Sequence, residues 1–260
     1  MALLEKIQRF NRLLQKSAAN GVDFMELAKL LSDMVDSNVY VVSKTGKILG
    51  YGLAEYELTL EWNQIMTVDQ KFPGQFNENL LKFTETVKNV ENKEPFYVFS
   101  SPEENEVFKK KNITIVPIVG GGTRLGTLVL ARLNKEFSDD DLILSEYGAT
   151  VVGMEIIRSE QEEIHEKARQ RAMVLMALES LSFSEQEAIQ HIFKELEGSE
   201  GLLVASKIAD RVGITRSVIV NAIRKLESAG VIESRSLGMK GTYIKVLNPL
   251  FLDQLEAIDK

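Results

Sequence analysis

Residues 205–224 read ASKIADRVGITRSVIVNAIR. A helix-turn-helix needs a small residue where its two helices touch, a residue that tolerates positive φ in the turn, and an apolar residue that anchors the second helix. Ala209, Gly213 and Ile219 supply these three at the required spacing. Thr215 is expected at the N-cap of the second helix. The segment therefore predicts a helix-turn-helix.

Two β-branched segments follow the second helix. Residues 231–235 and 242–246 have the composition of strands, and a glycine-containing turn at 237–241 separates them. Two strands in this place form the wing of a winged helix-turn-helix, with Arg235 and Lys240 near its tip.

The charge of this region differs from that of the rest of the chain. The 260 residues carry 31 Lys and Arg against 38 Asp and Glu, and the resulting charge of −7 taken alone argues against a nucleic-acid partner. Residues 202–246, however, contain eight basic and three acidic side chains, which gives +5 here and −12 for the remainder. Helix-glycine-helix segments also occur in ordinary bundles, but a basic region on a winged helix-turn-helix indicates duplex DNA as the partner.

We predict DNA-binding side chains on both the helices and the wing. Arg216, Ser217 and Asn221 lie on the early face of the second helix and suit base edges in the major groove. The predicted set also includes Thr215 at the start of that helix. The residues expected at phosphates or at the minor-groove edge are Lys207, Arg224, Arg235 and Lys240.

The composition excludes several classes of protein. The absence of cysteine removes disulfides, thiolate metal sites and cysteine nucleophiles, and only two histidines, His165 and His191, are present. We expect both histidines in surface or packing roles and predict no catalytic residues and no metal site. No apolar run approaches about 18 residues, the length needed to span a membrane. The first residues lack a signal-peptide pattern, so we expect a cytoplasmic protein.

The first part of the chain mixes helix and strand signals. Apolar residues at helical spacing predict one helix in residues 1–18 and a second that begins at Asp23, its N-cap. β-Branched segments joined by short turns predict hairpins over residues 38–51 and 113–131. We interpret residues 55–92 as helical turns and loop.

A long helix is predicted after these hairpins. Ser138 followed by Asp139–Asp141 is typical of a helix N-terminus, where carboxylates meet the positive end of the helix dipole. Three adjacent carboxylates point in different directions, which favours this role over a divalent-cation site. Beyond Ile157 the helix is charged on most faces, as in a connector between domains. Ser184 and Glu187 form an S-x-x-E capping box for the next helix.

Two weaker patterns have alternative interpretations. Residues 120–127 are glycine-rich, as in the phosphate loop of a nucleotide-hydrolysing enzyme, but no lysine precedes Thr127 and a β-segment follows, which favours a hairpin turn. A group of aromatic, methionine and proline residues lies in the least regular part of the N-terminal region, where a strand is expected at 96–99. By default these residues belong to the apolar core; alternatively, they line an apolar ligand pocket. This group comprises Met66, Phe72, Pro73, Phe96, Tyr97 and Phe99.

The sequence closely resembles the CodY family of global nutritional transcription regulators of low-GC Gram-positive bacteria. The resemblance covers nearly the whole chain and is strongest at 205–242, 115–130 and 139–155. It implies an α+β protein whose N-terminal GAF domain has an antiparallel sheet of five or six strands flanked by helices. A long linker helix and a C-terminal winged helix-turn-helix domain follow.

Applied to this sequence, the resemblance places the domains and their roles. The GAF ligand-sensing domain is expected at 1–157, the linker helix at 158–182, and the DNA-binding domain at 183–260 with its helix-turn-helix motif at 205–224. CodY proteins are dimers that bind branched-chain amino acids, chiefly isoleucine, in the GAF pocket, and many respond to GTP. With ligand they bind promoter DNA and mostly repress genes for amino-acid uptake, biosynthesis and adaptation to starvation.

The resemblance also implies which residues line the ligand pocket. Phe72-Pro73 match the lid loop of the family. Many relatives have an arginine four residues before the pocket methionine, where this chain has Trp62, so the ligand carboxylate would need backbone N–H groups or another cation. The pocket positions carried over are Met66, Phe72, Pro73, Tyr97 and Phe99.

The positions associated with GTP are only partly kept. Lys44-Thr45 replace two arginines and Glu160 replaces a lysine, so the chain has fewer cations for a triphosphate and one more carboxylate. We predict a weak GTP response or none. The retained positions are Ser43, Lys47 and Glu155.

These patterns favour a ligand-gated DNA-binding regulator and leave two alternatives. One is the nucleotide-hydrolysing enzyme considered above, which lacks the phosphate-loop lysine and a general base. The other is a constitutive DNA-binding or scaffolding protein with a vestigial sensor domain, which the Trp62 change permits.

Overall fold

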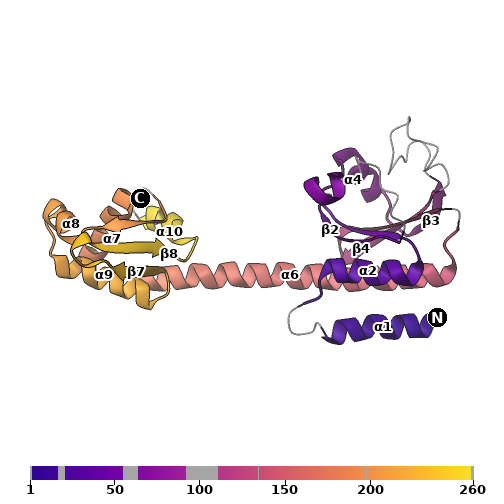
Figure 1. The fold of residues 1–260 in the computed structure, drawn as a ribbon, viewed down its shortest axis with the longest axis horizontal. Coiled ribbons are helices and arrows are strands. Elements are labelled where there is room, and N and C mark those ends of the chain that lie inside the picture. Colours follow the sequence, from indigo (N-terminus) through magenta and orange to yellow (C-terminus); the bar gives the residue numbers. More distant parts are fainter. Residues whose placement is uncertain are drawn as a thin grey trace. The chain divides into compact units, whose positions relative to one another are not determined.

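The chain divides into two units, residues 1–161 and residues 162–260, in a computed structural model (Figure 1). Within its described residues, no helix is long and apolar enough to cross a membrane. Each unit has its own apolar core. The structure describes residues 2–16, 21–54, 64–91, 111–133, 135–196 and 198–258.

The first unit is built on a five-stranded antiparallel sheet with strand order β2-β1-β5-β4-β3. The two predicted hairpins are confirmed: β1 pairs with β2, and β4 pairs with β5 across the glycine turn. The elements are α1 (Leu3–Lys16), α2 (Phe24–Val35), β1 (Asn38–Ser43), β2 (Ile48–Gly52), the π-helix η1 (Ile65–Asp69), α4 (Gly74–Leu81), β3 (Val87–Glu91), β4 (Lys111–Gly120), β5 (Thr123–Leu133) and the first part of α6 (Asp139–Glu179).

Both faces of this sheet are buried, which explains the continuous apolar runs of its strands. In β1, Val39 and Val41 pack into one cluster with residues of α2 and α6, whereas Tyr40 and Val42 pack into a second cluster on the opposite face. Figure 1 shows α2 and α6 on one side of the sheet and α4 on the other. The sheet therefore separates a face covered by long helices from a face covered by α4.

One strand of this sheet was not predicted. β3 lies in a segment that the sequence analysis interpreted as turns and loop, and that interpretation is wrong here. The pairing of β3 with β4 shifts register between Val87 and Val90, and Asn89 has a left-handed φ of 53°. A bulge in an edge strand removes the period-2 alternation by which strands are recognised. The strand predicted at 96–99 lies outside the described residues.

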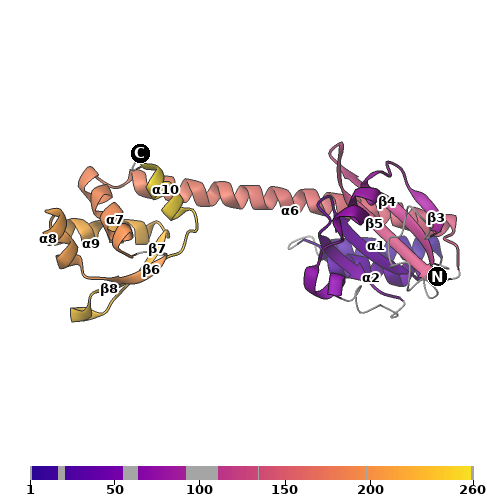
Figure 2. The same ribbon diagram turned by 90° about the horizontal axis from the view of Figure 1, so that it is seen from above.

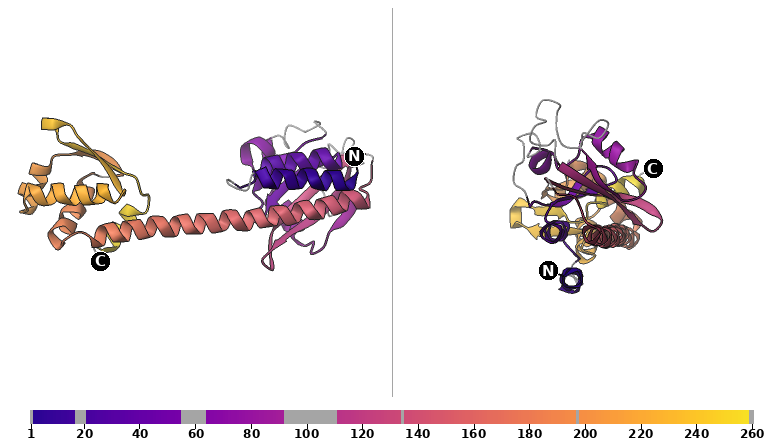
Figure 3. Two further views of the ribbon diagram at one scale, coloured as in Figure 1. Left: turned by 90° about the horizontal axis from the view of Figure 1, so that it is seen from below. Right: turned by 90° about the vertical axis from the view of Figure 1, so that its right-hand side faces the viewer.

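The two N-terminal helices lie side by side (Figure 3). Asp23 caps α2 as predicted, because its carboxylate accepts a backbone N–H at 2.8 Å. The Lys6 ammonium donates to the carbonyl of Met34 at 2.6 Å and so joins α1 to the end of α2. Phe10 packs edge-on against Tyr147 of α6 at 5.5 Å.

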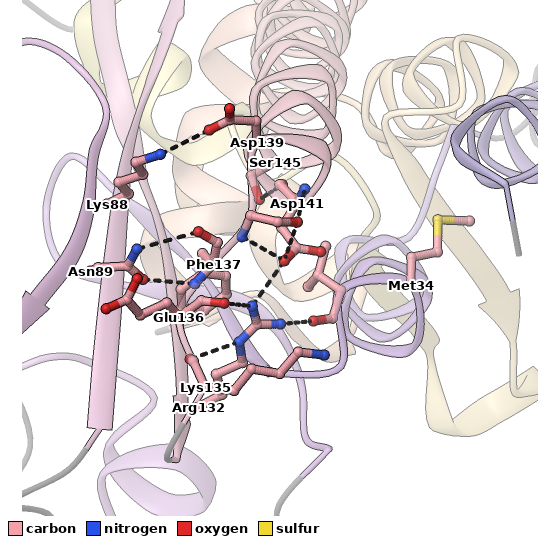
Figure 4. Close-up of polar contacts among 12 residues, drawn as sticks. Met34, Lys88, Asn89, Arg132, Lys135, Glu136, Phe137, Asp139, Asp141 and Ser145 are labelled. Atoms are coloured by element: carbon pink, nitrogen blue, oxygen red, sulfur yellow. Dashed lines mark hydrogen bonds and ion pairs between the residues drawn. The ribbon is translucent and has the colours of Figure 1, made fainter.

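A buried arginine joins the sheet to the long helix (Figure 4). The side chain of Arg132, at the end of β5, is only 3% exposed. Its guanidinium donates to the carbonyls of Val35 at 2.7 Å and Lys135 at 3.1 Å, and to that of Glu136. It also forms an ion pair with Asp141 at 2.9 Å. This one group therefore holds the end of α2, the β5–α6 connection and the first turn of α6.

Asp139 and Asp141 at the start of α6 have different partners. Asp141 accepts from the backbone N–H of Ser138 at 3.0 Å and from its hydroxyl at 2.9 Å, while Asp139 pairs with Lys88 at 2.8 Å. In the described part of the chain, no cluster of acidic or histidine side chains could hold a metal ion. Burial alone would raise the pKa of Asp141, but the hydrogen bonds from Ser138 and Arg132 outweigh it and hold that pKa below its ordinary value.

The second unit packs helices against a three-stranded sheet of order β6-β8-β7. The end of α6 belongs to this unit: Val174, Ala177 and Leu178 are buried in its core, and the carbonyl of Gln170 accepts from the Asn248 amide at 2.9 Å. The further elements are α7 (Phe183–Leu196), β6 (Glu200–Leu203), α8 (Ala205–Val212), α9 (Arg216–Ser228), β7 (Ile232–Ser236), the 3-10 turn η2 (Gly238–Lys240), β8 (Thr242–Val246) and α10 (Phe251–Ile258).

The capping box of α7 lies two residues before the predicted one. The N–H of Ser182 donates to the Glu185 carboxylate at 2.7 Å, and the N–H of Glu185 donates to the Ser182 hydroxyl at 3.4 Å. The prediction of Ser184 and Glu187 was therefore wrong. Both pairs fit the S-x-x-E pattern, but Glu185 also reaches Lys225 of α9 at 2.7 Å, a tertiary contact that selects the earlier start.

Replacing Asp141 by Asn should strongly destabilise the first unit. The change leaves the buried guanidinium of Arg132 without its anion, which costs about 3 kcal/mol in the free energy of unfolding. Amide hydrogen exchange of β5 and α2 across a urea titration measures the unfolding of this unit. The matched control is Asp139→Asn, whose carboxylate is 86% exposed and should matter little.

The pH dependence provides a second measurement of the same contact. Because folding lowers the pKa of Asp141, its stabilising contribution is complete above its ordinary value of about 3.9 and is lost as the pH falls through the folded value. The wild type and Asp141→Asn should therefore differ most near neutral pH and converge in acid. Equal stability of the two proteins at neutral pH would contradict the assigned role.

Candidate nucleic-acid interface and ligand site

The predicted helix-turn-helix is confirmed. Gly213 ends α8 with a left-handed φ of 73°, and its N–H donates to the carbonyl of Ala209 at 3.0 Å. Ala209 is 5% exposed and Ile219 is fully buried, as the contact between the helices and the anchor of α9 require. α8 and α9 are thus joined by a three-residue turn and fixed to a common core.

One side of α9 is exposed and polar. The side chains of Arg216, Ser217, Asn221 and Arg224 are all exposed on this helix. Thr215 occupies the N-cap position as expected, but its hydroxyl contacts that of Ser217 at 2.8 Å and makes no hydrogen bond to a backbone N–H of the helix. The first turn of α9 therefore keeps backbone N–H groups available to an anionic partner.

The wing is a hairpin of β7 and β8 that projects from the second unit (Figure 2). Arg235 and Lys240 are exposed on it, as predicted. β6 (Glu200–Leu203) pairs with β8 and extends the wing to three strands, which the sequence analysis did not predict. Lys207, at the start of α8, is also exposed.

Two of the eight basic residues in this region are used internally. Lys225 pairs with Glu185 at 2.7 Å, and Arg211 pairs with Glu195 at 3.3 Å. Burial alone would raise the pKa of Glu185, but hydrogen bonds from Lys225 and Ser182 hold it below its ordinary value. Among the described residues no ion pair occupies the cations predicted to contact DNA, which are Lys207, Arg216, Arg224, Arg235 and Lys240.

The described part of the predicted ligand pocket lies on the α4 face of the sheet. Met66 and Phe72 are 2% and 1% exposed and belong to the same apolar cluster as Tyr40, whose ring meets that of Phe72 edge-on at 6.2 Å. Pro73 is exposed and immediately precedes α4. The remaining positions of the prediction, Trp62, Tyr97 and Phe99, lie outside the described residues.

The Phe72-Pro73 segment is hydrogen-bonded to the turn between β1 and β2. The N–H of Phe72 donates to the carbonyl of Gly46 at 2.8 Å, and the Asn77 amide donates to the carbonyl of Lys44 at 3.0 Å. Asn77 was not predicted as a site residue, because no local sequence pattern marks a side chain that bonds a distant turn. The β1–β2 turn and the Phe72-Pro73 segment are therefore directly connected.

Arg124 fixes the other end of α4. Its guanidinium donates to the carbonyl of Phe83 at 2.5 Å and to that of Leu80 at 3.4 Å, at the C-terminal end of that helix. Partial burial lowers its pKa from the ordinary value. Arg124 was predicted only as part of a turn, although a cation in a hairpin turn is a signal that could have identified it as a residue with a distant partner.

Glu155, the acidic residue that is retained among the positions associated with GTP, already has intramolecular partners. The buried carboxylate of Glu155 accepts from the N–H of Val22 at 3.1 Å and pairs with Arg158. Lys44 and Thr45 are exposed in the β1–β2 turn. Arg158 therefore competes with any ligand group for Glu155.

Full-length relatives and a solved domain are similar to this chain. It is 59% identical over 261 residues to the global transcriptional regulator CodY of Anoxybacillus flavithermus, and 59% identical over 259 residues to that of Geobacillus thermodenitrificans. In both alignments 99% of each protein is covered. The cofactor-binding GAF domain of the nutrient sensor CodY from Clostridium difficile aligns with a TM-score of 0.44 and 39% identity, over 60% of this chain and 99% of that one.

Family models match both units. The CodY GAF-like domain matches residues 2–180, and the CodY helix-turn-helix domain matches residues 199–259. The fold agrees with both descriptions, since an antiparallel sheet with helices is followed by a long helix and a winged helix-turn-helix. The chain belongs to the CodY family of global transcriptional regulators.

Proposed function

We propose that this protein is a dimeric repressor whose binding to promoter DNA is controlled by a branched-chain amino acid, chiefly isoleucine. The observation that carries this proposal is a set of exposed cations, without ion-pair partners among the described residues, on a winged helix-turn-helix within a chain of net charge −7. Such a surface binds duplex DNA, while the net negative charge of the remaining residues disfavours contact of DNA with other parts of the chain. Its place of action is the cytoplasm, where promoter DNA lies, and it is not an enzyme.

Three parts of the chain have different roles in this proposal. Residues 1–157 sense the ligand, residues 158–182 form the linker helix that joins the two domains, and residues 183–260 bind DNA. Residues 159–169 are exposed along α6, in keeping with a linker helix. A dimer would present two copies of α9 to two half-sites of an operator.

The α4 face of the sheet is the proposed amino-acid site. Met66 and Phe72 offer an apolar wall for a branched aliphatic side chain, and Pro73 lies beside them at the start of α4. Tyr97 and Phe99, which lie outside the described residues, belong to this site by the resemblance of the sequence alone. Ligand in this pocket would displace Phe72 and, through its bond to Gly46, the β1–β2 turn.

Isoleucine should raise the affinity of the full-length protein for promoter DNA. A gel-shift titration with and without millimolar isoleucine measures this, with alanine at equal concentration as the control ligand. We expect an increase of at least about tenfold, since a coupling free energy of 1–3 kcal/mol is usual. Equal DNA affinity in both titrations would support a constitutive DNA-binding protein with a vestigial sensor and contradict the gated regulator.

Two cation-to-alanine variants should separate base reading from phosphate contact. Arg216→Ala should abolish the preference for the operator over random duplex, because a bidentate base contact contributes about 1–3 kcal/mol of discrimination. Lys240→Ala should weaken binding to all duplexes alike and reduce the slope of log affinity against log salt by about 1. A change in sequence preference in Lys240→Ala would contradict its assignment to phosphate.

GTP should bind weakly or not at all. Calorimetric titration of the wild type with GTP should give no saturable heat. Of the three substituted positions only Lys44 is a cation, whereas Thr45 is neutral and Glu160 is an anion, and Glu155 is paired with Arg158. The double variant Thr45→Arg, Glu160→Lys should gain GTP affinity by at least about tenfold. Tight, saturable binding by the wild type would overturn this part of the proposal.

A further inference from the structure

The tip of the wing carries an apolar side chain in full contact with solvent. Met239 is 104% exposed, the highest value for a large apolar side chain in the described part of the chain, and Leu237 beside it is 43% exposed. Turns of this kind are usually polar, because an exposed apolar side chain gains nothing from folding. The turn therefore presents an apolar surface that folding alone does not explain.

The backbone of this turn is held in a fixed shape. The N–H of Leu237 donates to the carbonyl of Gly241 at 2.8 Å, and the N–H of Gly241 donates to that of Gly238 at 3.2 Å. Gly238 and Gly241 have φ of +63° and +112°, values that favour glycine. A Cβ on Gly241 would lie 2.3 Å from the carbonyl oxygen of Leu203, so the turn is pressed against the end of β6. Met239 is thus presented by a pre-organised turn.

The surroundings of Met239 indicate which partner would cover it. Lys240 follows it directly and Arg235 lies on β7 of the same hairpin, and both are exposed. The DNA minor groove combines strongly negative potential with a floor of base edges, and proteins that enter it place Arg or Lys at the backbone and an apolar wedge, often Met, Leu or Phe, against a base step. A cationic hairpin with an apolar tip has this chemistry.

We propose that Met239 is a minor-groove wedge: it inserts between the edges of a base step beside the helix-turn-helix site and bends the duplex. The inference rests on the proposed DNA binding of the second unit. It adds a residue whose contact depends on how easily the duplex bends at a given base step. Pyrimidine–purine steps unstack most easily, so Met239 would favour operators with such a step under the wing. Leu237 widens the apolar surface at the base of the turn.

A bending assay with the full-length protein tests the wedge. The probe is a duplex of about 40 base pairs, selected for binding by the wild type, with a fluorophore at each end so that energy transfer reports the bend. Met239→Ala should lose about tenfold in affinity and most of the change in energy transfer. Met239→Leu should retain both, because it keeps the apolar bulk. The matched control is Leu247→Ala, which removes a side chain that is 51% exposed outside the turn and should behave as the wild type.

The outcomes separate this inference from the proposed function. If Arg216→Ala loses operator preference while Met239→Ala keeps wild-type affinity and bend, the wedge is wrong and the DNA reader stands. If neither variant changes binding, the assignment of the whole interface fails. A 2-aminopurine base placed under the wing should brighten when the wild type binds and stay dim with Met239→Ala, and equal brightening with both proteins would also overturn the wedge.

Discussion

The guanidinium of Arg132 makes the sheet of the first unit and the start of α6 a single body. It lies at the end of β5 and reaches the last carbonyl of α2 and the carboxylate of Asp141 in the first turn of α6. Sliding of β5 against α6 would leave a buried charge without a partner, which costs several kcal/mol. The helix that leads to the DNA-binding unit is therefore fixed to the strand at the centre of the sensor sheet.

The two faces of that sheet are held in different ways. The face under α2 and α6 is closed by long helices and by contacts such as Phe10 with Tyr147. The α4 face has an apolar cluster of its own, which includes Tyr40 and Phe72, and polar bonds of Asn77 and Arg124 hold α4 on it; the Asn77 carbonyl oxygen is buried without a partner among the described residues. The α4 face is also the side on which the proposed amino-acid site lies.

The sequence predicted those features that depend on local pattern. The roles of Ala209, Gly213 and Ile219 follow from spacing alone, and the hairpins follow from β-branched runs separated by turns. The GAF-like fold came from resemblance, since no local pattern identified that domain. Charge counting located the basic region at residues 202–246, because its charge of +5 remains visible inside the total of −7.

Predictions from the sequence failed where contacts between distant residues determine the structure. β6 and β3 form because other strands pair with them, and the left-handed Asn89 hides the alternation of β3. Two overlapping S-x-x-E patterns competed for the start of α7, and the bond of Glu185 to Lys225 selected one of them. The same bond removes Lys225 from the cations available to DNA, which a count of charges cannot reveal.

The central claim is that the ligand site and the DNA site are energetically coupled, and coupling between two binding sites is reciprocal. Calorimetric titration of isoleucine into the full-length protein, alone and saturated with operator duplex, tests it most directly. Bound DNA should tighten isoleucine binding by the same factor by which isoleucine tightens DNA binding. Identical isoleucine affinities with and without DNA would contradict it.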